Sequence, residues 1–343
     1  MCRYCTIVPQ SVLLKLSKDT RFSDDVRQGL VNTARLDNET RKVREQARKL
    51  TRTSLAISPT LATLAPAPSV LVYDCKNTQV LPGTPVSNPA GSTDPTVKRA
   101  FETTTAVADF YQQLFGRNSI DDAGMSLLSS VHYGMNYNNA FWNGFQMTYG
   151  DGDGAIFVDF TKGDDVVCHE LTHGVTQFSL QLTYSNEPGG LNESMSDVFG
   201  VMFNQWRASD GAKPPSWLVG EDVMGPQAID KGYACLRDMA KPGANHCLAP
   251  QPDHYKQYVP GMDPHESSGI PNLAFYKIAT AIGGDSWDKP GQIWYRALSG
   301  FGPSPNMKMK KFANRTRTVA AQLFPGNQAI AKAVDTGWKQ VGL

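Results

Sequence analysis

The sequence predicts an α+β fold whose strands come early and whose helices dominate the second half. Apolar runs at 70–73 and 155–158 are typical of strands. A largely apolar helix is expected near 164–180, because two acidic residues follow a glycine there and favour the positive end of a helix dipole. Amphipathic stretches that indicate later helices lie near 192–207, 268–282 and 314–323.

The composition fits a chain large enough for two cores, with unevenly distributed charge. The chain has 343 residues, 41% of them hydrophobic, and a net charge of +1. Residues 1–67 contain 12 basic and 6 acidic residues, which leaves 21 basic and 26 acidic residues in the remainder. Because the basic part lacks interleaved aromatic residues and has an acidic body to dock on, we expect intramolecular association and no nucleic-acid partner. No apolar run approaches the length of a membrane span, and we expect a monomer that contacts no membrane.

Residues 169–173 read His-Glu-Leu-Thr-His, a pattern that predicts a metal site. On a helix, His169 and His173 project from one face with Glu170 beside them. Glu193 begins a predicted second helix and is able to supply the third ligand, while Asp197 accepts the N–H of a ligand histidine. Three protein ligands leave the fourth position of one zinc ion open for water, which indicates catalysis. On the pentapeptide alone, a surface helix with two histidines and a salt-bridging glutamate is an equal alternative.

The histidine motif, followed by GGLNESMSD at 189–197, resembles the thermolysin family of zinc metallopeptidases (the M4 family). Other resembling segments follow in the same order at 138–144, 149–154, 217–222, 252–255 and 265–272. The similarity therefore covers roughly residue 70 to the C-terminus. It implies a two-lobed fold with an α/β N-terminal lobe, a central zinc-binding helix, a mainly α-helical C-terminal lobe and a substrate cleft between them.

The resemblance implies a zinc-dependent neutral endopeptidase that acts on peptides or proteins. Glu170 lies beside a ligand histidine and is placed to take the proton of the zinc-bound water and to pass it to the leaving amine. By resemblance, Tyr184 and His265 donate to the oxyanion that forms on the scissile carbonyl. In the family an aspartate on a longer loop orients the catalytic histidine. Asp263 is closer in sequence here, so its equivalence is in doubt.

The same resemblance implies the substrate-binding residues. Asn139 and Ala140 would hold an extended peptide, and Arg237 would bind a substrate carbonyl beside the pocket for the residue after the scissile bond. The positions that match the lining of this pocket are all apolar: Phe157, Phe160, Val166, Val219, Val223 and Leu236. We therefore expect cleavage on the N-terminal side of Leu, Phe, Ile or Val, with a broad preference because one methylene changes discrimination by only about 1–3 kcal/mol.

Calcium binding is expected to be weak. Asp165 and Glu221 match calcium ligands of the family, but Asn204, Ser216 and Leu218 stand where further ligands are expected. Fewer carboxylates weaken a site for a hard cation. At most one calcium ion is expected.

The N-terminal block, residues 1–67, resembles the short propeptide of the protealysin-like branch of the family. Helices are expected at 12–16 and from about 23 to 49, and the segment after them is rich in Ser, Thr, Ala and Pro, as in an exposed linker. The resemblance implies a zymogen in which this block inhibits residues 68–185, the N-terminal catalytic subdomain with its zinc helix, and residues 186–343, the helical C-terminal subdomain. The branch has two consecutive prolines where this chain has Pro9-Gln10, and an accessory domain without an inhibitory role is the alternative.

The cysteines leave alternatives open. A thiolate is a strong zinc ligand, so Cys2 or Cys5 is able to take the fourth zinc position and keep the precursor inactive. Free or mutually bonded thiols are an equal alternative. Cys235 and Cys247 either close a loop or stay reduced.

Two alternative functions are considered, and the cellular location is predicted. A zinc aminopeptidase-like hydrolase would need a motif that captures the substrate's α-amine, and the sequence shows none. Glu170 argues against a catalytically silent, zinc-dependent peptide-binding protein, because binding alone needs no general base. The first residues lack the apolar stretch of a secretory signal, so we expect a cytoplasmic protein or export by a non-classical route.

Overall fold

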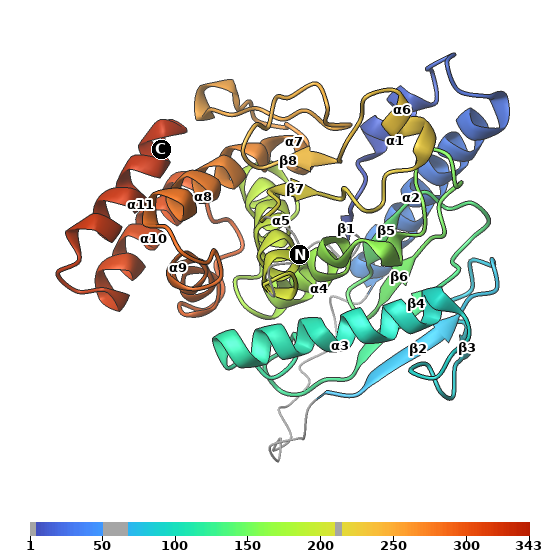
Figure 1. The fold of residues 1–343 in the computed structure, drawn as a ribbon, viewed down its shortest axis with the longest axis horizontal. Helices are drawn as coiled ribbons and strands as arrows, with labels where there is room; N and C mark the ends of the chain where they lie inside the picture. Colours follow the sequence, from blue (N-terminus) through green and yellow to red (C-terminus); the bar gives the residue numbers. More distant parts are fainter. Residues whose placement is uncertain (1–4, 51–67, 210–214) are drawn as a thin grey trace.

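Two packed helices occupy the middle of the molecule and separate a sheet from a helical lobe (Figure 1). The computed structural model describes residues 5–50, 68–209 and 215–343, and for residues 41–50 the backbone alone. The central helices are α4 (Asp164–Phe178) and α5 (Asn186–Arg207), which pack against each other. α4 confirms the helix predicted near 164–180, and α5 begins before the predicted 192–207.

One six-stranded mixed sheet forms the first lobe, in the order β1-β5-β6-β4-β2-β3. The strands β2, β4 and β6 run parallel to one another, whereas β1, β5 and β3 pair antiparallel to their neighbours. Their bounds are Cys5–Thr6 for β1, Val70–Asp74 for β2, Thr84–Pro85 for β3, Leu127–Val131 for β4, Ala140–Trp142 for β5 and Met147–Tyr149 for β6. β2 confirms the strand predicted at 70–73. β1 comes from the N-terminal block and occupies one edge of the sheet.

The strand predicted at 155–158 is wrong. This segment is a loop with one isolated bridge, from Phe157 to Met224. The Asp153 carboxylate accepts hydrogen bonds from three successive backbone N–H groups, at residues 155, 156 and 157. Since a strand would offer its N–H groups to neighbouring strands in turn, this local capture favours a turn over a ladder.

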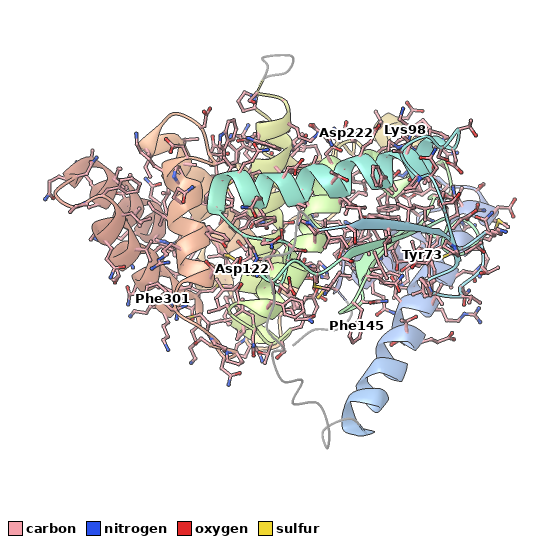
Figure 2. The ribbon with its side chains drawn as sticks, turned by 90° about the horizontal axis from the view of Figure 1, so that it is seen from below. Tyr73, Lys98, Asp122, Phe145, Asp222 and Phe301 are labelled. Atoms are coloured by element: carbon pink, nitrogen blue, oxygen red, sulfur yellow. The ribbon has the colours of Figure 1, made fainter. Side chains whose placement is uncertain are left out.

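Helix α3 (Pro95–Phe115) lies across the sheet, as Figures 1 and 2 both show. It begins where the Asp94 carboxylate accepts from the backbone N–H of Thr96, and it ends at Gly116, whose φ of 66° needs a glycine. His132, in the loop after β4, lies between Asp151 and Asp94, at 2.9 and 3.0 Å. Hydrogen bonding to Asp151, joined by Asp94, raises the pKa of His132 to about 9.

The second lobe is mainly helical and includes the two-stranded sheet of β7 (Leu218–Val219) and β8 (Arg237–Asp238). Its helices are α6 (Pro226–Asp230), α7 (Pro264–Ser267), α8 (Gly269–Ile282), α9 (Lys289–Ser299), α10 (Met309–Leu323) and α11 (Gln328–Gln340). α8 and α10 confirm two predicted helices, while α9 and α11 went unpredicted. Trp294 and Trp338 stack in its core with ring centroids 5.7 Å apart.

Two glycines let α7 approach α5. A Cβ on Gly190 would lie 2.3 Å from Ser267 Oγ, and one on Gly189 would lie 2.8 Å from Pro264 Cγ. Any larger residue would push the two helices apart. The pair lies inside α5, and the close approach that it permits places His265 of α7 beside α5.

The N-terminal block contains β1, α1 (Gln10–Leu16) and α2 (Asp24–Leu50), which confirm both predicted helices. Leu13, Leu16 and Leu30 are buried and belong to the same apolar core as the sheet and α4. Figure 2 shows the end of α2 projecting from the rest of the molecule. The block is thus packed into the body at one end and extends away from it at the other.

Candidate active site

Three side chains from α4 and α5 converge on one buried point. His169 Nε2 and His173 Nε2 lie 3.1 Å apart. Glu193 reaches both imidazoles, with its two carboxylate oxygens each 3.5 Å from one of the Nε2 atoms. At most 3% of any of the three residues is exposed. The structure therefore brings the three predicted zinc ligands together.

The hydrogen bonds behind the histidines show that these residues fit a cation. His169 Nδ1 donates to Asp197 Oδ1 and His173 Nδ1 donates to Asn192 Oδ1, each at 2.9 Å. When both rings are neutral, their Nε2 atoms present lone pairs to each other, at a distance that two acceptors do not tolerate without a cation between them. Glu193 Oε2 is buried and has no hydrogen-bond partner among the described residues. Two imidazole nitrogens and a carboxylate are a ligand set that zinc prefers.

A buried ion pair, Arg237 with Asp197, supports the ligand histidine His169. Arg237 donates to both oxygens of Asp197, at 2.7 and 2.9 Å, and Asn272 Nδ2 donates to the same carboxylate at 2.8 Å. Burial alone would raise the pKa of Asp197, but the charge of Arg237 and the contact with His169 hold it at about 2. Asp197 is therefore an anion that orients His169.

The charges of the other ligands follow from burial and from one another. Burial lowers the pKa of His173 to about 4, so its ring is neutral and able to bind a metal. Burial would raise the pKa of Glu193, yet the neighbouring His265 and His173 keep it well below its usual range. The ligand set thus combines a neutral imidazole with an ionised carboxylate.

Glu170 lies beside the ligand histidines and is held by the sheet. Its Oε2 accepts a hydrogen bond of 2.8 Å from the backbone N–H of Trp142, in β5. Neither its carboxylate nor the rest of the residue is exposed. The predicted base is therefore fixed between α4 and β5.

The side chains of Tyr184 and His265 both lie beside the predicted ligand Glu193. The Tyr184 hydroxyl donates to Glu193 Oε1 and lies 3.2 Å from His265 Nε2. Asp263 begins α7 and accepts from both the backbone N–H and Nδ1 of His265, at 2.9 and 2.8 Å. Burial opposes protonation of His265, but Glu193 and Asp263 together raise its pKa to about 9. Asp263 therefore contacts His265 despite its shorter loop.

Residues 5–8 of the N-terminal block lie along β5 as an added antiparallel strand. The backbone N–H of Ile7 donates to the Ala140 carbonyl at 3.1 Å. Asn139 pairs with Val8 on both sides, accepting from its N–H at 2.9 Å and donating to its carbonyl at 3.0 Å. The residues predicted to hold an extended substrate thus hold the chain's own beginning.

Two side chains from the helical lobe complete these contacts. Arg237 donates to the Ile7 carbonyl at 3.0 Å, and His265 Nε2 donates to the Thr6 carbonyl at 2.7 Å. Ile7 is fully buried in the same apolar core as the predicted pocket residues. All six of those residues are at most 1% exposed: Phe157, Phe160, Val166, Val219, Val223 and Leu236.

The Cys5 thiol reaches the metal-ligand cluster. Its Sγ and one ligand atom each of His173 and Glu193 all lie within 4.8 Å of one another. Cys5 is 1% exposed. Cys2, the other predicted inhibitory ligand, lies outside the described residues.

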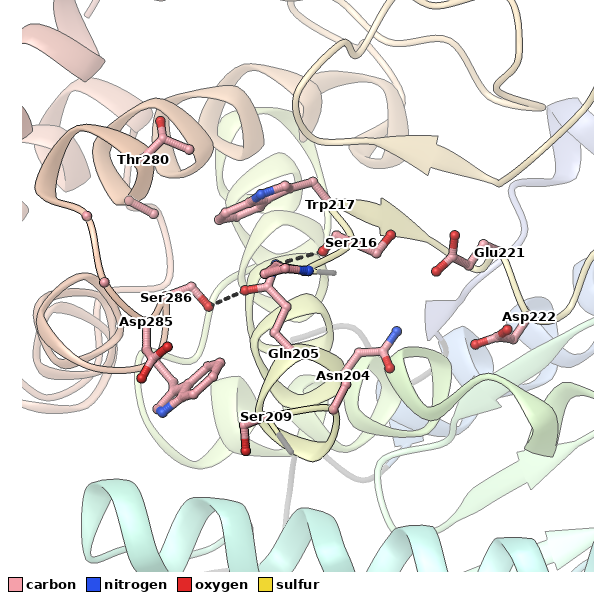
Figure 3. A pocket seen from close by; sticks show the side chains of 16 residues that line it. Asn204, Gln205, Ser209, Ser216, Trp217, Glu221, Asp222, Thr280, Asp285 and Ser286 are labelled. Carbon is pink, nitrogen blue, oxygen red and sulfur yellow. Dashed lines mark hydrogen bonds between the residues drawn. The ribbon is translucent and has the colours of Figure 1, made fainter. Parts of the chain in front are cut away.

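The two predicted calcium ligands, Asp165 and Glu221, have different surroundings in the structure. Asp165 is buried and accepts from the backbone N–H groups of Val166 and Gly220, at 2.9 and 2.6 Å, and burial raises its pKa to about 7. Glu221 instead lines a cavity between α5 and β7 (Figure 3). Gln205 spans that cavity by bonding the Ser216 carbonyl and the Ser286 hydroxyl. Calcium binding stays a prediction.

The residues predicted as zinc ligands, base and oxyanion donors thus lie together around one buried point between the two lobes. The chain belongs to the thermolysin family. The description "Thermolysin metallopeptidase, catalytic domain" matches residues 27–177, and "Thermolysin metallopeptidase, alpha-helical domain" matches residues 180–343. The protein is accordingly a zinc-dependent, thermolysin-like metalloendopeptidase.

Individual relatives agree with this family. "Extracellular metalloprotease" of Pectobacterium carotovorum subsp. carotovorum is 40% identical over 283 residues, which cover 79% of this chain and 80% of that protein. "Thermolysin" of Bacillus sp. (strain EA1) is 36% identical over 80% of this chain and 51% of that protein. The structure of the precursor of protealysin, a metalloproteinase from Serratia proteamaculans, matches with a TM-score of 0.83 and 34% identity, covering 98% of this chain and 99% of that one.

The expected location is wrong. The sequence predicts a cytoplasmic protein, or one exported by a non-classical route. A relative with 40% identity bears the name "Extracellular metalloprotease", which points to secretion. No helix among the described residues is long and apolar enough to cross a membrane.

Several residues that contact the site were not singled out in the sequence. Asn192 orients His173, Asn272 supports Asp197, and Trp142 holds Glu170 through its backbone. Asp37 of α2 accepts from Asn139 Nδ2 at 2.9 Å, so the N-terminal block also contacts the site from behind. Trp142, Asn192 and Asn272 lie in segments that resemble the family, which is the clue by which they could have been found, whereas Asp37 lies outside the resembling part.

Proposed function

We propose that this enzyme cleaves peptide bonds on the N-terminal side of hydrophobic residues, and that the 343-residue chain is its latent, secreted precursor. The observation that carries the proposal is the placement of residues 5–8, which contact Asn139, Ala140, Arg237 and His265 as an extended peptide. The buried Ile7 indicates which kind of side chain the neighbouring pocket accepts.

The residues of the candidate active site have separate roles in peptide hydrolysis. Zinc, when bound by His169, His173 and Glu193, supplies a Lewis acid that polarises the scissile carbonyl and acidifies water. Glu170 takes the proton of the attacking water and delivers it to the leaving amine. His265 and Tyr184 donate to the developing oxyanion.

Substrate binding follows from the strand addition. Asn139 and Ala140 provide backbone hydrogen bonds that are independent of sequence, and Arg237 provides a charged donor to a carbonyl. The apolar pocket then gives the preference, since burial of a Leu or Phe side chain contributes about 1.5–3 kcal/mol. A charged side chain there would lose its hydration without a partner.

Latency follows from occupation of the same contacts. A substrate cannot pair with β5 while β1 does so, and linkage to the body makes the competing segment an intramolecular ligand. The match to a protealysin precursor over 98% of the chain supports this interpretation.

The structure favours an endopeptidase over an aminopeptidase. Cys5 pairs with Trp142 on the N-terminal side of Thr6, whose carbonyl contacts His265. The cleft therefore admits chain on both sides of the catalytic position, whereas an aminopeptidase closes one side around a free amine.

The test compares wild type and Glu170→Gln after removal of the N-terminal block by an added protease, with Glu102→Gln as a surface control. Zinc-loaded wild type and the control should cleave peptides before Leu, Phe, Ile or Val, and Glu170→Gln should be slower by about 10²–10⁴-fold with unchanged zinc content. Equal cleavage before charged residues would refute the preference. Full activity of Glu170→Gln would refute the assigned base.

A further inference from the structure

We propose that the Cys5 thiolate is the fourth zinc ligand of the latent chain, and that it protects a peptide bond, Thr6–Ile7, that is otherwise placed to be cut. This inference rests on the proposed function of the site. On this proposal, residues 5–8 do more than block the cleft: they are a bound substrate that is held uncleaved.

The direction and register of the segment place one bond at the catalytic centre. Thr6 offers its carbonyl oxygen to His265 Nε2, the predicted oxyanion donor. The next residue, Ile7, is fully buried in the apolar core that also contains the predicted pocket residues, donates to the Ala140 carbonyl and accepts from Arg237. The Thr6–Ile7 bond thus lies between the oxyanion donor and the pocket for the residue after the cut.

The thiol lies where the attacking water is needed. Cys5 Sγ is within 4.8 Å of ligand atoms of His173 and Glu193, and ligand atoms around a tetrahedral zinc lie roughly 3–4 Å apart. Glu193 Oε2 is fully buried without a hydrogen-bond partner among the described residues, as expected of a metal ligand. Cys5 itself is buried but lies outside the apolar core that includes Ile7. A thiolate added to two imidazoles and a carboxylate closes the site.

Loss of this ligand makes the bound segment reactive. Water then adds to the Thr6 carbonyl, Glu170 takes its proton, the bond from the Thr6 carbonyl carbon to the Ile7 nitrogen breaks, and the proton passes to that nitrogen. The products are a carboxylate at Thr6 and an amine at Ile7, so the step consumes one water and needs no oxidant or reductant.

The first experiment detects the ligand without relying on activity. The Glu170→Gln precursor, which should not cleave itself, is loaded with Co²⁺, and its near-ultraviolet absorption is recorded. A thiolate-to-cobalt charge-transfer band is expected. It should disappear in Cys5→Ser and persist in Cys2→Ser and in Cys75→Ser, a matched buried cysteine of the sheet lobe. A band that is absent, or that disappears with Cys2 instead, overturns the proposal.

The second experiment detects the protected bond. Zinc-loaded Cys5→Ser and Cys5→Ala precursors should lose residues 1–6 and acquire Ile7 as their N-terminus, as measured by intact mass and N-terminal sequencing. Cys75→Ser and the double variant Cys5→Ser with Glu170→Gln should stay whole at this bond. Zinc content and circular dichroism show whether each variant is folded.

The two proposals fail in different ways. Suppose that the Cys5 variants are folded and loaded with zinc but keep the Thr6–Ile7 bond, and that wild type freed of its N-terminal block cleaves peptides. The inference about Cys5 is then wrong, and the proposed function stands. If the freed wild type cleaves nothing, the proposed function is wrong.

Discussion

Replacement of Asp37 by alanine is expected to release residues 5–8 from the cleft. Asp37 lies on α2, is 2% exposed and accepts hydrogen bonds from Asn139 Nδ2 and from the Tyr137 hydroxyl. Asn139 makes both backbone hydrogen bonds to Val8. The carboxylate therefore connects the long helix of the N-terminal block to the residue that holds its first strand.

The magnitude follows from the groups that lose their acceptor. A buried donor left without a partner costs about 1–3 kcal/mol, so two donors give about 2–6 kcal/mol. The lower value applies best, because Asn139 Nδ2 keeps the Val8 carbonyl as a second acceptor. About 2 kcal/mol corresponds to a roughly 30-fold larger open population.

Hydrogen exchange measures this population directly. In the inactive Glu170→Gln background, the amides of Ile7 and Val8 should exchange roughly 30-fold faster in Asp37→Ala than in its parent. Asp25→Ala, an exposed acid on the same helix, should leave both rates unchanged. Unchanged exchange in Asp37→Ala would refute the inferred coupling between α2 and the cleft.

Three further outcomes are expected. Asn192→Ala should weaken zinc binding about 10–100-fold in competition with a chelator, because His173 loses the acceptor that orients its ring; an unchanged affinity would remove this role. The pKa of His132 is raised from about 6.5 when unfolded, so its contribution to stability is complete below about pH 6.5 and is lost as the pH rises through about 9. The difference in melting temperature between wild type and His132→Asn should therefore shrink over this window, and a difference independent of pH contradicts it. The sulfur atoms of Cys235 and Cys247 lie 3.8 Å apart across an isolated bridge, so a disulfide oxidant should remove both thiols and stabilise the fold by about 3 kcal/mol; thiols that persist after oxidation would count against this pairing.

Local patterns were enough to predict the parts of the site that share one helix. His169, Glu170 and His173 are set by helical spacing, which acts over four residues. Amphipathic periodicity likewise predicted α8, α10 and both helices of the N-terminal block. The resemblance to a family supplied the distant residues, such as Arg237, for which spacing alone gives no reason.

The rest depends on contacts between segments that no local pattern records. A backbone N–H of Trp142 holds Glu170, and any residue other than proline offers the same donor. Asp37 and Asn139 are 102 positions apart in the chain. The segment 155–158 has a strand-like pattern, but one carboxylate, that of Asp153, turns it into a loop.

The position of β1 at the end of the sheet has a further consequence if the N-terminal block is removed as proposed above. When β1 leaves, β5 becomes the outermost strand, and its unpaired backbone groups lie next to Phe145, which is 68% exposed. Such an edge is a template for pairing between copies and hence for aggregation. Because β1 covers this edge, we expect the N-terminal block also to reduce self-association of the precursor proposed above. After removal of the N-terminal block, the exposed edge is short, because β5 has three residues.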